Sequence, residues 1–558
     1  MVKSRPTSRT PASQRASLEA VVRAADENLP LAIELAKQAQ ASGIADPFIH
    51  RLLAIERQQA GSFEEAITEA GLGLQLAPHD AELMTLVGFC LLELGRRQEA
   101  AQVFAAAIKA DPLSAEANYG YGWAAERLGA LEAADSAFAR ALALNPSHAD
   151  AHAGKSGLAV RRRDWRIARA EAEAAILSDP RQTDALMNLA RIDAGERNFA
   201  AAEQRLRSII ALEHLKPQAR ANARIMLGDA LDAQGRHQEA FYCYSSGKAE
   251  LRAQSAHLFE RPDLPTAVDG VNRLLGEFLA TPASDWATRH PRPTIGGEHG
   301  HAFLLGFPRS GTTLLEQILA THPLITTLEE RPVLLQAEAE FLTRPGGISR
   351  LGGALGELLE PFREDYWRRV KDFGVKPNHG VFIDKHPLNT IRIPLIKKLF
   401  PSSKIIFALR DPRDVIFSCF RRSFNMNISM YQFNTLMGAA TYYDAVMKAG
   451  SSYIERLELD VFFLRYEELV GDFDMTLDRL CEFLGISWND SFRGFAEAAA
   501  NRRIATPSST QVGRGLYEDG IGQWRHYAAM LDPVLPLLEP WIVKFGYSMD
   551  EALGPAAA

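Results

Sequence analysis

The sequence predicts a two-part fold, in which an N-terminal α-solenoid is followed by an α/β domain with a mostly parallel sheet. Two observations support this prediction. Prolines recur every 34 residues in the first half, at Pro78, Pro112, Pro146 and Pro180, which indicates repeated helical pairs. From His301 onward, short apolar runs such as SKIIFALR alternate with amphipathic stretches. Strands that alternate with helices are typical of a parallel sheet.

Length and composition limit the possible architectures. A chain of 558 residues is expected to hold about two or three domains. The net charge of −7 gives no indication of nucleic-acid binding, and the absence of any apolar run of about 18 residues predicts no membrane span. The 4 cysteines form no CxxC and no paired spacing. This argues against a zinc site or a disulfide framework and favours a reducing compartment, so we expect a cytoplasmic protein.

Residues 1–16 are polar and basic without an apolar core, and we interpret them as a disordered leader, with a transit peptide as the alternative. Residues 17–254 are predicted to form the solenoid. Several positions recur in phase with the prolines, namely Gly88 and Gly122, Gly95 and Gly129, Ala100 and Ala134, Phe104 and Phe138, and Ala107 and Ala141. This pattern resembles the tetratricopeptide repeat, in which small residues lie where paired helices approach.

We expect roughly six such repeats, with residues 17–46 as a capping pair. Stacked repeats leave a concave groove, where a protein or peptide partner is expected to dock; a structural or dimerising spacer is the alternative. Residues 255–299 are expected to be a linker, in which stretches rich in Pro and Gly flank one helical stretch, VNRLLGEFLA. Residues 300–548 form the α/β domain and residues 549–558 a tail.

The stretch HAFLLGFPRSGTTLLEQILAT reads as a strand, a turn and a helix. Backbone amides at the start of such a helix form a phosphate cradle. Arg309 adds a charged fork of donors. The turn that is expected to bind phosphate comprises Pro308, Arg309, Ser310, Gly311, Thr312 and Thr313. Measured against the P-loop pattern, Thr312 stands where the lysine belongs, which disfavours triphosphate hydrolysis and favours a donor without a γ-phosphate.

PRSGTTLLEQIL is similar to the 5′-phosphosulfate-binding loop of sulfotransferases that use 3′-phosphoadenosine 5′-phosphosulfate (PAPS), and THPLITTLEERPV resembles the matching segment of the tyrosylprotein sulfotransferases. The whole chain resembles bacterial proteins that join tetratricopeptide repeats to such a domain. The resemblance implies a P-loop-like α/β fold and PAPS as the sulfuryl donor. It requires no metal, because in-line displacement at sulfur needs positioning and charge stabilisation.

The resemblance also implies which residues grip the 3′-phosphate. In KIIFALRDPRDVIFSCF, Arg410 and Ser418 match the family residues that do so. Arg422 lies four residues beyond Ser418 on the same helical face and could join them. Arg413 and Asp414, in the same turn, are expected to be a solvated charge cluster.

For the catalytic base, the family carries a glutamate that matches Glu330, and we prefer it over Glu329. A family arginine that is associated with acceptor binding is replaced here by Pro332, which casts doubt on a peptidyl-tyrosine acceptor. Lys385 matches a lysine that stabilises the leaving oxygen. His386 is a rival base, and since adjacent residues of a strand point to opposite sides, only one of the two is expected to line the site.

Tyr466 resembles a tyrosine that contacts the donor nucleotide, and Ser508 and Gln511 match the family's donor-binding C-terminal loop. Gln523 replaces a family lysine there, for which Arg514 or Arg525 could substitute. Two other functions stay open: a nucleotide kinase or NTPase, and a scaffold with a vestigial nucleotide-binding domain. The acceptor carries a hydroxyl group, and sugars, lipids, small phenols and protein tyrosines all remain candidates. A homo-oligomer is compatible with the sequence.

Overall fold

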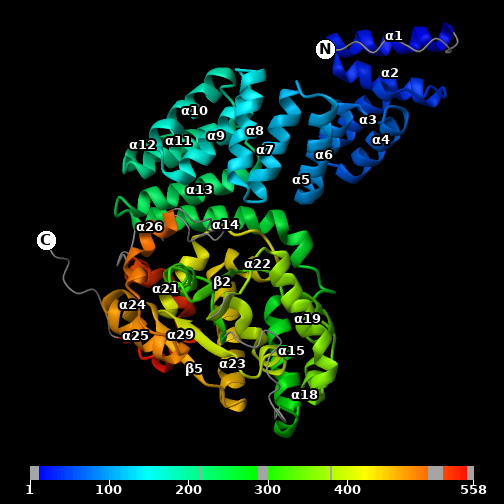
Figure 1. Cartoon of the computed structure of the whole chain (residues 1–558). Coiled ribbons are helices and arrows are strands. Elements are labelled where there is room, and N and C mark those ends of the chain that lie inside the picture. Colours follow the sequence, from blue (N-terminus) through cyan, green and yellow to red (C-terminus); the bar gives the residue numbers. More distant parts are fainter. Residues whose placement is uncertain (1–11, 214, 287–299, 378–379, 501–519, 550–558) are drawn as a thin grey trace. The chain divides into compact units, whose positions relative to one another are not determined.

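The computed structural model describes residues 12–213, 215–286, 300–377, 380–500 and 520–549, which Figure 1 shows as ribbons. The chain divides into two units between Arg205 and Leu206. The boundary expected after residue 254 therefore falls inside the second unit. The first helix begins at Ala12, within the segment expected to be a disordered leader.

The first unit consists of helices joined by short turns, as the repeat pattern predicts. Their bounds are α1 (Ala12–Glu27), α2 (Leu29–Ala41), α3 (Pro47–Gln59), α4 (Phe63–Leu76), α5 (Ala81–Glu93), α6 (Arg97–Ala110), α7 (Ala115–Arg127), α8 (Leu131–Leu144), α9 (Ala149–Arg162), α10 (Trp165–Ser178) and α11 (Thr183–Gly195), with α12 (Phe199–Ile210) running across the boundary. Polar side chains begin several of them: Asp46, Asp80 and Ser114 each accept a hydrogen bond from a first-turn amide.

The residues in phase with the prolines explain how neighbouring helices approach each other. Phe104 and Phe138 are buried. A Cβ atom on Gly88 would lie 2.6 Å from the Phe104 ring, and one on Gly122 would lie 2.7 Å from the Phe138 ring. Glycine at these positions makes room for the aromatic ring of the paired helix, which gives the recurring Gly and Phe a packing role.

The second unit is built on a five-stranded sheet with the order β2-β3-β1-β4-β5. The strands are β1 (Gly300–Gly306), β2 (Ile325–Glu329), β3 (Val381–Lys385), β4 (Lys404–Leu409) and β5 (Val461–Arg465). All neighbouring strands are parallel. The predicted parallel α/β architecture is thus confirmed, and its strands end at one common edge, where ligands bind in sheets of this type.

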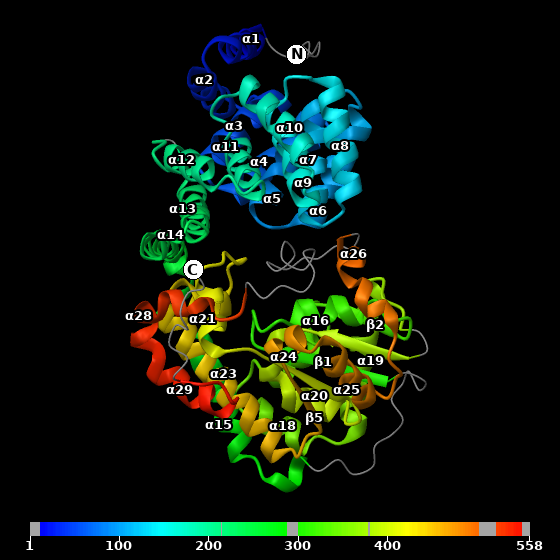
Figure 2. The same ribbon diagram turned by 90° about the vertical axis from the view of Figure 1, so that its left-hand side faces the viewer.

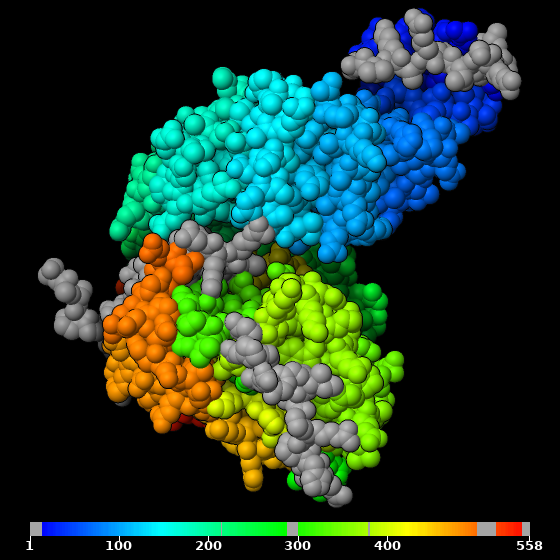
Figure 3. Space-filling view, in the orientation of Figure 1, coloured from blue at the N-terminus to red at the C-terminus, as the bar shows by residue number. Residues whose placement is uncertain are grey.

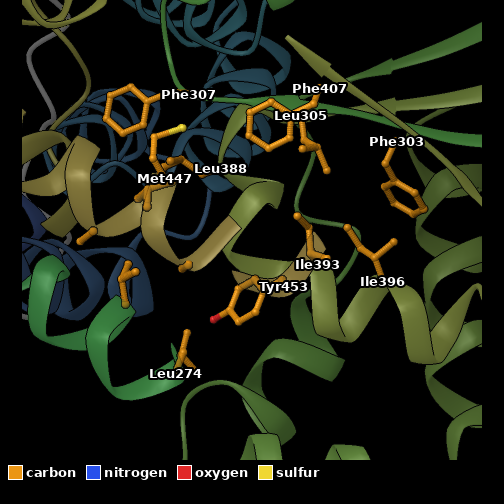
Figure 4. Packing of buried hydrophobic residues seen from close by; sticks show 14 of the residues in the cluster. Leu274, Phe303, Leu305, Phe307, Leu388, Ile393, Ile396, Phe407, Met447 and Tyr453 are labelled. Carbon is orange, nitrogen blue, oxygen red and sulfur yellow. The ribbon is translucent and has the colours of Figure 1, made fainter. Parts of the chain in front are cut away.

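The two faces of β1 pack against different helices. Phe303 and Leu305 are two positions apart in β1, so their side chains point to the same face of the sheet. Together with Phe307, which directly follows β1, they pack in one apolar cluster. Figure 4 shows this cluster with Ile393 and Ile396 of α20 (Ile393–Leu399) and Met447 and Tyr453 of α23 (Leu436–Arg456). The other face packs against α16 (Thr312–Leu319) and α25 (Phe473–Leu484) (Figure 2).

The remaining helices surround this core. Their bounds are α13 (Pro217–Asp232), α14 (His237–Phe259), α15 (Ala267–Ala280), η1 (Ala283–Trp286), α17 (Leu335–Phe341), α18 (Gly347–Gly353), α19 (Gly356–Asp372), η2 (Pro387–Arg392), α21 (Pro412–Phe420), α22 (Ile428–Tyr431), η3 (Gln432–Asn434), α24 (Tyr466–Gly471), η4 (Asp490–Gly494), α26 (Phe495–Ala500), η6 (Gln523–Tyr527), α28 (Ala528–Leu531), η7 (Asp532–Val534) and α29 (Leu535–Lys544). α26 lies beside α16, orange beside green in Figure 3.

The segment expected to be a linker contributes to the core instead. Within residues 255–299, α15 begins with a capping box between Thr266 and Asp269. Its residues Leu274 and Phe278 are buried in the cluster beneath the sheet. The helical stretch expected between the Pro- and Gly-rich flanks, residues 271–280, lies within α15, but it packs into the core rather than serving as a linker.

Candidate active site

The turn between β1 and α16 is held in a backbone conformation that few residues adopt. Arg309 has a φ of 72° and Gly311 a φ of 92°, both in the left-handed region. A Cβ atom on Gly311 would lie 2.7 Å from Cδ2 of Tyr466. The Pro308 carbonyl accepts a hydrogen bond of 3.5 Å from Sγ of Cys419. The hydroxyl residues of the turn are buried, namely Ser310, Thr312 and Thr313.

Residues that follow β4 contact this turn. Nε of Arg309 donates a hydrogen bond of 2.9 Å to Oγ of Ser418 on α21. Nη1 of Arg410 donates to the carbonyl oxygen of Arg309 over 3.2 Å, and its guanidinium lies 4.9 Å from the centre of the Tyr466 ring. The structure therefore brings together Arg309, Arg410, Ser418 and Tyr466, which come from three separate sequence motifs.

Arg422 makes its ion pair with the helical hairpin α13–α14. Its Nη1 lies 2.7 Å from Oδ2 of Asp229 on α13. The sequence places Arg422 on the same helical face as Ser418, but α21 ends at Phe420, so the helical spacing does not continue to Arg422. The contact with Asp229 was not predictable from the sequence, because the two residues are 193 positions apart.

A buried lysine lies among three carboxylates at the ends of β2 and β3. The side chain of Lys385 is 0% exposed, and its Nζ lies 2.8 Å from Oε1 of Glu330, 3.5 Å from Oε1 of Glu329 and 3.7 Å from Oε2 of Glu316. Burial favours the neutral amine, but the carboxylates of Glu316, Glu330 and Glu329 outweigh it and raise the pKa of Lys385 above its ordinary value. Lys385 is therefore a cation at neutral pH.

Glu330 is held by its backbone as well as by its side chain. Its φ of 44° lies in the left-handed region, and its amide donates a hydrogen bond of 2.8 Å to the carbonyl oxygen of Lys385. Non-glycine residues in this region are concentrated at functional sites. Arg309 and Glu330 share this feature, and both were predicted as catalytic residues.

Glu330 also lines a cavity of about 220 Å³. The cavity is lined by Glu330, Arg331, Pro332, Val333, Leu334, Leu335, Glu338, Asp384, His386, Asn389 and Arg392. Lys385 and His386 diverge, as expected for adjacent residues: Lys385 contacts the carboxylate cluster, while His386 faces the cavity. Glu330 belongs both to the carboxylate cluster around Lys385 and to the lining of the cavity.

Two of the residues that line this cavity each carry a buried polar atom with no hydrogen-bond partner within the described ranges, Oδ1 of Asp384 and Nδ1 of His386. The other Asp384 oxygen accepts a hydrogen bond of 3.0 Å from the Tyr366 hydroxyl. Burial raises the pKa of Asp384 to about 7 and lowers the pKa of His386 to about 3. His386 is therefore a neutral imidazole at physiological pH.

Arg413 and Asp414 were expected to be solvated, and this expectation was wrong, since each is 1% exposed. Asp414 accepts hydrogen bonds from the amides of Gly522 and Trp524, and Arg413 lies 3.6 Å from the centre of the Trp524 ring. The pair anchors the C-terminal segment. Gln523 begins η6 in this segment.

Three predicted C-terminal positions lie outside the described residues, namely Ser508, Gln511 and Arg514. The sequence analysis also missed Glu316. All eight residues of α16 are buried, and a glutamate in such a helix was the available signal, because a buried carboxylate is rarely without a partner. Burial raises the pKa of Glu316 despite Lys385 nearby.

In the described part of the chain, no group of three or more His, Cys, Asp or Glu side chains could hold a metal ion. Among its helices, none has both the length and the apolar character needed to cross a membrane.

Comparison with known proteins agrees with this geometry. The sulfotransferase family matches residues 302–490, and the tetratricopeptide repeat matches residues 91–149 and 156–194. An uncharacterised protein of Aquifex aeolicus is 26% identical over 43% of this chain and 32% of its own length. Protein-tyrosine sulfotransferase A of Caenorhabditis elegans is 26% identical over 55% of this chain and 80% of its own. Protein-tyrosine sulfotransferase 1 of Danio rerio is 27% identical over 44% and 71%.

The chain thus spans about a third of the Aquifex protein and most of the two animal proteins. The matched family range contains the β1–α16 turn, the Lys385 cluster and α21. The protein is a chain of tetratricopeptide repeats followed by a domain of the sulfotransferase family.

Proposed function

We propose that this protein transfers a sulfuryl group from PAPS to a hydroxyl-bearing acceptor. The observation that carries the proposal is that two sets of residues lie at the carboxyl ends of the neighbouring parallel strands β1 and β3. One set is the β1–α16 turn with Arg309, and the other is the Lys385–Glu330 pair. The first is suited to bind a phosphosulfate, and the second is suited to activate a hydroxyl group.

In the proposed donor complex, the amides and hydroxyls of the β1–α16 turn bind the 5′-phosphosulfate. Arg410 and Ser418 bind the 3′-phosphate. The hydrogen bond between Arg309 and Ser418 supports this division, because it holds the two phosphate-binding regions against each other before the donor arrives. Tyr466, which covers Gly311 and lies beside Arg410, is placed to contact the nucleotide.

In the proposed transfer, Glu330 takes the proton of the acceptor hydroxyl while that oxygen attacks sulfur. The bond between sulfur and the bridging phosphate oxygen breaks, and adenosine 3′,5′-bisphosphate leaves with the electron pair. Lys385 and Arg309 stabilise the charge that develops on the leaving oxygen. Lys385 also orients the base, because its Nζ donates a hydrogen bond of 2.8 Å to Oε1 of Glu330.

We assign the base to Glu330 rather than to His386. Burial holds the pKa of His386 at about 3, so gaining a proton would place an unfavourable charge on a desolvated imidazole. Glu330 is 36% exposed and already bonds a cation. His386 is instead placed to contact the acceptor from the cavity.

The cavity beside Glu330 is the proposed acceptor pocket. Two of its lining residues carry a buried atom without a partner among the described residues, Oδ1 of Asp384 and Nδ1 of His386, and a ligand with only one polar group could not satisfy both. This favours an acceptor that presents a further hydroxyl or amide group beside the one that is sulfated. A carbohydrate meets that condition, and so does a tyrosine whose neighbouring peptide groups enter the cavity. Docking of a protein acceptor on the repeats belongs to the second case.

The proposal is tested by incubating the full chain with sulfur-35-labelled PAPS and three acceptor classes in turn: tyrosine-containing peptides, simple carbohydrates and small phenols. Label on any acceptor, together with release of the bisphosphate, supports sulfuryl transfer. The Arg309→Ala variant serves as the negative control. Intact PAPS in every reaction, combined with phosphoryl transfer from ATP, would favour the kinase alternative.

A further inference from the structure

The last helical hairpin, α13–α14, is joined to the sulfotransferase part by charged contacts as well as by packing. The guanidinium of Arg421, directly after α21, lies 3.1 Å from Oδ2 of Asp232 and 4.0 Å from Oδ1 of Asp229. Arg421 is 7% exposed. A buried cation needs its partner, because an unpaired charge in such a place costs several kcal/mol.

A second contact extends the same junction. Nζ of Lys248 on α14 donates a hydrogen bond of 2.6 Å to the carbonyl oxygen of Arg422. Lys248 is 1% exposed. The chain just beyond α21 is therefore held by both helices of the hairpin, α13 through its aspartates and α14 through this lysine.

Asp232 also binds the C-terminal segment. Oδ1 of Asp232 accepts a hydrogen bond of 2.5 Å from the Tyr527 hydroxyl and lies 3.0 Å from Nδ1 of His237. The Tyr527 ring lies 4.0 Å from the ring of Phe417 on α21. One carboxylate thus connects the hairpin, the end of α21 and η6.

The elements that Asp232 connects are the ones that carry the donor site. α21 contributes Ser418, which binds Arg309. At its other end, Asp414 of α21 binds the amides of Gly522 and Trp524, next to η6. A shift of α21 would therefore move Ser418 relative to Arg309 in the β1–α16 turn.

We propose that the hairpin α13–α14 is a positioning element of the donor site, and that Asp232 is its principal positioning residue. Asp232 acts through Arg421 and Tyr527, which hold α21 so that Ser418 meets Arg309. The inference rests on the proposed function for the identity of the donor, but the placement of α21 can be measured without it. It also makes the hairpin a part of the catalytic unit rather than of a separate docking array.

The test uses the full chain in four forms: wild type, Asp232→Asn, Tyr527→Phe and Glu250→Gln. The Asn variant keeps the shape of Asp232 but removes the charge that pairs with Arg421. The Phe variant removes only the hydroxyl and keeps the ring, so it serves if the Asn variant does not fold. Glu250 is the matched control, because it pairs with Arg224 over 3.2 Å inside the hairpin.

Two quantities are measured for each form, the dissociation constant of adenosine 3′,5′-bisphosphate and the hydrogen-exchange rate of α21 amides. We expect Asp232→Asn to weaken binding roughly fivefold and to speed exchange in α21 by a similar factor. Tyr527→Phe should do so to a smaller extent. Glu250→Gln should change neither, even if it lowers the unfolding temperature.

Unchanged binding and unchanged α21 exchange in both test variants would overturn the inference. Equal effects in Glu250→Gln would also overturn it, since they would show general loosening of the hairpin. Failure of the wild type to bind the bisphosphate would count against the proposed function alone. The exchange comparison would then still decide whether Asp232 holds α21.

Discussion

Lys385, which has no solvent exposure, donates a hydrogen bond of 2.8 Å from Nζ to Oε1 of Glu330 at the carboxyl edge of the sheet. The lysine ends strand β3, and the glutamate directly follows strand β2. In the register of these strands Lys385 is opposite Glu329, so Glu330 is the first residue past the paired region. This position lets its carboxylate reach both the lysine and the cavity.

Glu330→Gln is predicted to bind adenosine 3′,5′-bisphosphate as the wild type does and to lose sulfuryl transfer. The amide keeps the shape of the side chain but cannot take a proton. The loss should be at least about a hundredfold in kcat. Glu340→Gln is the matched control, since Glu340 is 35% exposed against 36% for Glu330 and pairs with Arg350 away from the cavity. Equal loss of binding and transfer in Glu330→Gln would argue against its role as base.

Arg309→Ala and Arg410→Ala are each predicted to raise the dissociation constant of the bisphosphate by at least about tenfold, because each removes charge-assisted hydrogen bonds to a phosphate. Arg422→Ala should have a smaller effect, since its guanidinium is engaged by Asp229. Titration calorimetry of the three variants measures their dissociation constants for the bisphosphate and so ranks the three effects. An effect of Arg422→Ala as large as that of Arg410→Ala would show that Arg422 leaves Asp229 to bind the donor.

Lys385→Met is predicted to lower the free energy of unfolding by about 3–5 kcal/mol, because it leaves the buried Glu316 carboxylate and its two acidic neighbours without their cation. Adding Glu316→Gln should restore part of that loss, since it removes the most buried of these charges. Denaturant unfolding of the single and double variants measures the coupling. Strictly additive losses would mean that Glu316 and Lys385 do not interact.

Lys248→Met is predicted to flatten the pH dependence of stability between pH 7 and about 10. Burial lowers the pKa of Lys248 to about 7, so above pH 7 the folded state has released a proton that the unfolded state keeps up to its ordinary pKa of about 10.4. The contribution of Lys248 to the free energy of unfolding therefore rises with pH in that window, by up to about 1.4 kcal/mol per pH unit. The variant should lack this rise. Lys109→Met, at an exposed position, should keep it.

The sequence was sufficient to predict features that depend on local pattern. The 34-residue phase identified the helical pairs because Gly88 and Gly122 must make room for Phe104 and Phe138. The β1–α16 turn was recognisable because an apolar run, a turn with Pro and Gly, and an amphipathic helix follow one another directly in the sequence. In the structure Gly311 of this turn has a positive φ, which glycine adopts readily. Lys385 and Arg410 were predicted from their resemblance to family residues, and in the structure Lys385 ends β3 while Arg410 directly follows β4.

Features that depend on distant pairing could not be predicted. Asp232 and Tyr527 are 295 residues apart, and no local pattern links them. Arg413 and Asp414 read as surface charge because their partners, Trp524 and Gly522, come from the far end of the chain. The end of the first unit was expected too late in the chain for the same reason: α13 and α14 continue the repeat pattern, while their side chains contact α21 and η6.

The most direct test of the central claim is calorimetric titration of the full chain with adenosine 3′,5′-bisphosphate and, separately, with ATP and magnesium. The β1–α16 turn lacks the lysine that reaches a γ-phosphate, and Arg309, Arg410 and Ser418 lie together. We therefore predict a dissociation constant on the order of micromolar for the bisphosphate and no binding of ATP. Binding of ATP without binding of the bisphosphate would contradict the assignment of this site to a PAPS donor.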